Sequence, residues 1–126
     1  MADPRGKRSV QVNVFNHTEA DLTVQGPSLG SSCSWISGQQ PNQGDTLAEF
    51  AAANWGVTTN DATATAQAWI SLSGLGSPMI NISVSNDHNG NTLCTATGNS
   101  VVNVTTQQQT SGEDAHAVWN ITLGSN

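Results

Sequence analysis

The apolar and polar positions of this chain alternate with a period of two over much of its length. The longest alternating run spans residues 62–72, where alanine, isoleucine or leucine occupies every second position. Residues 80–84 and 10–14 show the same pattern with isoleucine and valine. Successive side chains of a strand point to opposite faces of a sheet, so this period predicts strands with one buried face.

Gly, Pro, Asn and Asp residues punctuate the chain between these runs and predict turns. Shorter alternating or β-branched stretches lie between the turns and predict more strands. These further strands are expected at residues 22–24, 33–37, 100–107 and 115–123.

Two segments are less clear from the pattern. Residues 45–54 fit a helix that begins at Asp45 almost as well as a strand, and we interpret them as a strand. Residues 55–61 contain Gly, Asn and Asp and are interpreted as a loop. In the last strand, Trp119 is expected on the inward face.

The total is eight or nine short strands with turns between them and no helix of ordinary length. This pattern is typical of a sandwich or a barrel, and we predict an all-β, antiparallel two-sheet β-sandwich. With 126 residues the chain is long enough for one core. We expect a flexible basic lead at residues 1–8 and a single domain at residues 9–126.

The charge distribution excludes several kinds of partner. Arg5, Lys7 and Arg8 are the three basic residues of the chain, whose net charge is −6. A body without Lys or Arg is a poor match for nucleic acid and for anionic lipid. Zwitterionic lipid and sugar remain as partners. No apolar run is long enough to span a bilayer, and the N-terminus lacks the apolar segment of a secretion signal, so either the protein is used without one or a signal has been removed. We expect a protein that is secreted or released to act outside the cell.

No motif in the sequence predicts catalysis. Asp87 and His88 are the one adjacent acid–histidine pair, and nothing local supplies a nucleophile. We therefore expect no enzyme activity, no cofactor and no metal. Cys33 and Cys94 are candidates for a disulfide, with two free buried thiols as the equally weighted alternative. The Asn-x-Ser/Thr sequons at Asn16, Asn81, Asn103 and Asn120 are no more frequent than chance predicts.

Tryptophan carries the best signal for binding. Trp55 lies in a predicted loop, Trp35 flanks another, and Trp69 shares a strand face with Thr and Gln. An indole is apolar with a polar N–H, which suits stacking on a sugar or contact with a lipid interface. Packing against the edge of the fold is the alternative for each of them.

In order and spacing, the chain resembles the aegerolysin-like family, whose fold is also related to that of the actinoporins. The resemblance covers residues 9–123. It includes the opening strand at residues 10–14 followed by Asn16-His17-Thr18, the segment 45–50 that runs into a Phe, and the strand pair that ends in the polar tip 85–91. It is strongest to the small component of two-part insecticidal crystal proteins.

The resemblance implies a function in membrane-lipid recognition. The chain would be a cytolysin or insecticidal toxin component that acts with a larger pore-forming partner. Trp35 and Trp55 would enter the interface, and the polar tip would bind a head group through Asp87, His88, Asn89 and Asn91. A lectin-like carbohydrate-binding module is the alternative, because neutral amides and indoles serve sugars equally well. Pairing of edge strands in a homo-oligomer stays open.

Overall fold

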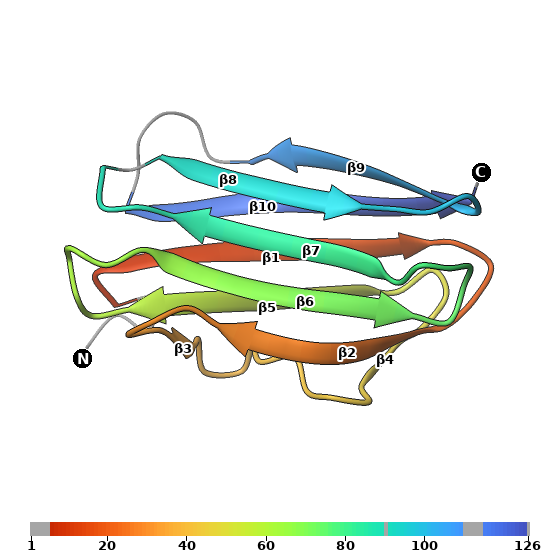
Figure 1. The fold of residues 1–126 in the computed structure, drawn as a ribbon, viewed down its shortest axis with the longest axis horizontal. Coiled ribbons are helices and arrows are strands. Elements are labelled where there is room, and N and C mark those ends of the chain that lie inside the picture. The colour runs from red at the N-terminus through yellow and green to blue at the C-terminus, as the bar shows by residue number, and fades with distance from the viewer. Residues whose placement is uncertain (1–5, 90, 110–114, 126) are drawn as a thin grey trace.

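The computed structural model describes residues 6–89, 91–109 and 115–125. These residues form ten strands in two stacked five-stranded sheets (Figure 1). Sheet A has the order β3 (Ser34–Trp35), β5 (Ala52–Thr59), β1 (Arg8–His17), β10 (His116–Ser125) and β9 (Val102–Gln108). Sheet B has the order β4 (Thr46–Leu47), β2 (Leu22–Leu29), β6 (Ala66–Ser73), β7 (Ile80–Asn86) and β8 (Thr92–Thr97).

The predicted two-sheet sandwich is confirmed, with two differences in its strands. Ten strands are present where eight or nine were predicted, because β4 and β5 are separate strands where one strand at residues 45–54 was expected. The other difference is that β1 and β10 pair in parallel, while the remaining ladders are antiparallel. The first and last long strands therefore lie side by side in the centre of sheet A (Figure 1).

The core lies between the sheets and follows the alternation in the sequence. Val10, Val12 and Val14 of β1 face sheet B and are at most 1% exposed. Ile70 and Leu72 of β6 face them from sheet B with the same exposure. Trp119 is half-buried against this core, and its indole N–H donates to Thr92 Oγ1 at 2.9 Å. Its inward orientation is confirmed.

Several predicted boundaries are wrong by a few residues. β6 begins at Ala66 rather than at residue 62. The loop expected at residues 55–61 is mostly the strand β5. The strand expected at residues 45–54 is instead β4, a turn and the start of β5. β1 begins at Arg8, inside the expected lead; residues 1–5 of that lead lie outside the described residues.

The disulfide considered between Cys33 and Cys94 is absent, since both cysteines are free. Cys33 precedes β3 at one edge of sheet A, and its thiol donates to Thr65 O at 3.2 Å. Cys94 is buried in β8, at the edge of sheet B that packs near β9 and β10. The two sulfurs lie at opposite edges of the sandwich, so a disulfide between them could not form unless the protein refolded.

Two features are absent from the described part of the chain. No helix there is long and apolar enough to cross a membrane. No group of three or more His, Cys, Asp or Glu side chains is arranged to hold a metal ion.

Candidate recognition surfaces

Trp55 is not on a loop, and its predicted role at an exposed rim is wrong. It lies in β5 with its side chain between the sheets, 6% exposed. Trp35 is partly buried at the same edge and lines the same apolar region, which leaves no room for a water molecule. Trp55 is therefore part of the core and not available to a membrane, whereas Trp35 packs against the core with part of its side chain.

The residues around Trp55 explain the wrong prediction. Asn54 and Gly56 are typical turn residues, but Gly56 has a different use here. A Cβ at this position would lie 2.5 Å from Gln39 Oε1 and 2.7 Å from Ile36 Cδ1. Gly56 therefore lets the side chains of Gln39 and Ile36, which follow β3, lie close against β5. Such a close approach is one of the uses of glycine inside a strand.

In the polar tip between β7 and β8, the Asp87 carboxylate accepts hydrogen bonds from the tip's own backbone. The backbone N–H groups of Asn89 and Asn91 donate to Asp87 Oδ1 at 2.9 and 3.0 Å. The bond from Asn91, followed by the one from Asn89, lowers the pKa of Asp87. Gly90, the predicted turn glycine, lies outside the described residues. Asp87, His88, Asn89 and Asn91 do lie together, but no exposed tryptophan lies in this tip.

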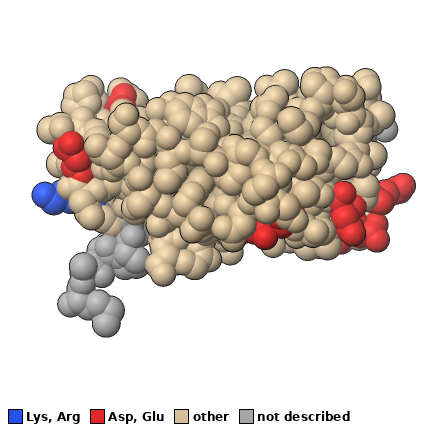
Figure 2. Space-filling view, turned by 60° about the horizontal axis from the view of Figure 1, so that its bottom comes forward, with Lys and Arg blue, Asp and Glu red and all other residues tan. Residues whose placement is uncertain are grey.

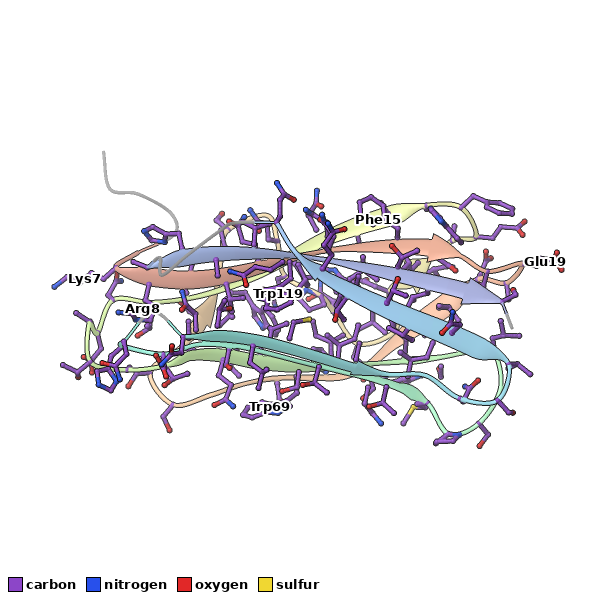
Figure 3. The ribbon with its side chains drawn as sticks, turned by 90° about the horizontal axis from the view of Figure 1, so that it is seen from above. Lys7, Arg8, Phe15, Glu19, Trp69 and Trp119 are labelled. Carbon is purple, nitrogen blue, oxygen red and sulfur yellow. The ribbon has the colours of Figure 1, made fainter. Side chains whose placement is uncertain are left out.

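Arg8 belongs to this tip and not to a free lead. Its side chain is 7% exposed at the end of the core, and its Nη2 donates to His88 O at 3.1 Å. Lys7, next to it, is tied by a backbone bond to Thr59 O. Figure 3 places both cations at one end of the molecule. We call this end, with the tip and the start of β1, the Arg8 end.

A serine–histidine contact occurs near the same end. Ser9 Oγ and His116 Nδ1 are 2.9 Å apart, on the paired strands β1 and β10. Sequence reasoning missed this contact because the residues are 107 positions apart. Ser9 is 0% exposed, so its hydroxyl does not meet a substrate, as a nucleophile must. The pair is a bond between neighbouring strands.

Trp69 is the most exposed tryptophan among the described residues. It lies on the outer face of sheet B and is 38% exposed (Figure 3). Its cross-strand neighbours are Ser28 on β2 and Ser83 on β7. Of the three tryptophans predicted as binding residues, it is the most accessible.

The opposite end of the sandwich holds apolar side chains that the sequence analysis did not select. The connections at residues 18–21, 48–51, 74–79 and 98–101 all lie at this end, where β1, β6 and β8 finish (Figure 1). We call it the Phe50 end. It carries three of the five large exposed apolar residues of the described chain: Phe50 at 70%, Met79 at 45% and Val101 at 39% exposed.

Asn16 fixes the turn that presents Phe50. The Asn16 side chain is 0% exposed, and its Nδ2 donates to Leu47 O at 2.9 Å and to Ala48 O at 3.1 Å. Phe50 itself has a φ of 60°, which is rare for a bulky residue. Its backbone N–H donates to Asn16 O at 2.6 Å. Residues held in such sparsely populated backbone conformations cluster at functional sites, so this turn is a candidate for one.

Asn99 joins the two turns that carry Met79 and Val101. Its Nδ2 donates to Leu75 O at 3.0 Å and to Pro78 O at 2.9 Å. Its Oδ1 accepts from the backbone N–H of Val101 at 2.9 Å. The two apolar side chains are therefore presented by one bonded pair of turns. The sequence does hold a signal for their position in turns, because Met79 directly follows Pro78 and Val101 directly follows Ser100.

The two ends of the molecule differ in charge. Glu19, Asp21 and Glu49 lie at the Phe50 end, where no described Lys or Arg is found. Lys7 and Arg8 lie at the Arg8 end, together with Asp61 and Asp87. Figure 2 shows red surface mainly toward the two ends, blue at one of them, and a long uncharged surface between. Figure 3 likewise places Glu19 opposite Lys7 and Arg8.

Comparisons with known proteins give a fold and no family. No family model matches this chain, and no curated protein matches it. The chain is similar in structure to IP-1A from Alcaligenes faecalis, with a TM-score of 0.72 over 97% of this chain and 94% of that one. The two are 12% identical, so the similarity shows a shared fold.

Proposed function

We propose that this protein is a membrane-lipid-recognising component of a cytolytic or insecticidal toxin, which binds lipid of no net charge through the Phe50 end. A larger partner would form the pore. The resemblance to the aegerolysin-like family motivates the toxin part of the proposal. The observation that carries the lipid part is the group of three exposed apolar side chains on turns at one end of a rigid sandwich.

These side chains suit shallow insertion into a bilayer interface. Phe50, Met79 and Val101 project from turns, so a membrane can reach them without any change in the two sheets. Burial of one large apolar side chain contributes about 1.5–3 kcal/mol when it is complete. Three partly inserted side chains therefore supply enough free energy for reversible binding, as for other interfacial proteins.

The charges at this end select the head group. Glu19, Asp21 and Glu49 would be repelled by phosphatidylserine, but they attract the quaternary ammonium that zwitterionic choline lipids carry outermost. Phe50 adds an aromatic face, which also attracts such cations. Lipids with a phosphocholine head group are thus the best match.

The test is sedimentation with phosphatidylcholine and sphingomyelin liposomes. The unchanged protein is expected to bind, and Phe50→Ala to bind roughly tenfold more weakly, as loss of about 1.5 kcal/mol implies. Leu93→Ala is the matched control, because Leu93 is 62% exposed but lies on the outer face of sheet B. No binding to either lipid, or equal binding by Phe50→Ala, would contradict the proposal.

A further inference from the structure

The outer face of sheet B is built differently from the Phe50 end. None of its strands contains Asp, Glu, Lys, Arg or His. The outward side chains of β6 are Gln67, Trp69, Ser71 and Ser73, and those of β7 are Asn81, Ser83 and Ser85. One exposed indole thus lies in the middle of hydroxyl and amide groups.

The residues paired with Trp69 on the two neighbouring strands are small. Ser28 and Ser83 are its direct partners in the ladders, and Thr95 pairs with Ser83 on the next strand. These neighbouring side chains are small, and Trp69 is 38% exposed. Unlike Trp119, Trp69 makes no side-chain hydrogen bond within the described residues. Its indole N–H thus has no internal partner there, and part of its side chain is accessible.

From this arrangement we infer that the outer face of sheet B is a second binding site, for an uncharged carbohydrate centred on Trp69. A sugar ring has apolar C–H faces that stack on an indole and hydroxyl groups that bond to side chains around it. Gln67 and Asn81 supply amide donors and acceptors on either side of the indole, and Ser83 supplies a hydroxyl.

The chemistry of the face disfavours the other occupants. Nucleic acid requires Lys or Arg, which sheet B lacks. A bilayer would have to desolvate many hydroxyl and amide groups in order to accept one indole, which is costly. A protein interface normally has several apolar residues at its centre. The direct partners of Trp69 are Ser, and Leu93, the other large exposed apolar residue of this face, lies two strands away on β8.

The experiment uses the full chain and neutral cello-, chito- and manno-oligosaccharides. Binding is screened on an array and measured by titration calorimetry. At least one of these series is expected to bind, and Trp69→Ala to weaken it roughly tenfold or more. Phe15→Ala is the matched control, since Phe15 is an aromatic residue on the outer face of sheet A, and it should bind normally (Figure 3).

Ser83→Lys is a second variant that keeps the indole but places a long side chain beside it. It should also lose sugar binding, while thermal unfolding checks that each variant is folded. Trp69→Ala should still bind phosphatidylcholine liposomes, which contain no sugar, so this inference and the proposed function can fail separately. Absence of binding in all three series, equal binding by Trp69→Ala, or a Trp69-dependent dimer without sugar binding would overturn the inference.

Discussion

Burial makes the two thiols of this protein chemically different. Cys94 lies in β8 at 7% exposure, and desolvation raises its pKa to about 12. Cys33 is partly exposed, and its Sγ contacts the carbonyl oxygens of Ser31 and Thr65. Since the thiolate is the reactive form, a buried thiol with a raised pKa is inert.

We therefore predict that iodoacetamide near pH 8 adds one group to the folded protein, at Cys33, and two groups after denaturation in urea. Intact mass and peptide mapping would show the sites. Cys33→Ser should give no rapid adduct. A native mass lower by two hydrogens, or labelling of Cys94 first, would contradict both the free state of the cysteines and the burial of Cys94.

At the level of elements, the segment Asn16-His17-Thr18 organises the Phe50 end. Asn16 Nδ2 donates to three backbone carbonyls, and its Oδ1 accepts from the Thr18 backbone N–H and hydroxyl at 3.0 and 2.6 Å. These bonds fasten the turn after β1 to the turn before β5. The sequon at Asn16 is thus a buried structural motif.

Asn16→Ala should lower the free energy of unfolding by about 2–4 kcal/mol, because it leaves several buried backbone groups without partners. Asn81→Ala is the control: Asn81 also begins a sequon but is exposed on sheet B, so its loss should cost less than about 0.5 kcal/mol. Urea unfolding measures both. Equal effects would show that the Asn16 bonds do not hold the turns.

The elements also show how far sequence reasoning reaches in this fold. Strict alternation identified β1, β6 and β7, because each has one face in the core and one outside. It failed at β5, where Trp55 and Val57 are buried between polar or small neighbours that equally suit a loop. Asn and Gly serve both turns and close approaches, and only the partner strands decide which.

The candidate surfaces were harder to predict for a related reason. Whether Trp69 is covered depends on its neighbours, which the sequence alone left open, and both neighbours proved to be Ser. Phe50 and Met79 have no periodic pattern to mark them as exposed. They become a surface only because the turns of four different hairpins and connections meet at one end, which is a property of the topology.

At the scale of the whole molecule, the charge distribution makes the proposed orientation on a membrane testable. Glu19, Asp21 and Glu49 are at the Phe50 end, and Lys7 and Arg8 are at the other (Figure 3). If the Phe50 end faces the bilayer, the carboxylates approach the lipid and the cations point into solution. If the Arg8 end faces it, Lys7 and Arg8 approach the lipid beside Asp61 and Asp87, so the excess of carboxylates that repels an anionic lipid is absent.

Replacing about a third of the phosphatidylcholine by phosphatidylserine should therefore weaken binding roughly tenfold or more at low salt, since each like charge near such a surface costs about 1 kcal/mol. Added salt should relieve the repulsion, because screening shortens its range to about 3 Å at 1 M. Glu19→Gln together with Glu49→Gln should reduce the lipid dependence, whereas Lys7→Gln should not change it. Stronger binding to phosphatidylserine, with loss of that preference in Lys7→Gln, would place the Arg8 end on the membrane and return the lipid site to the polar tip.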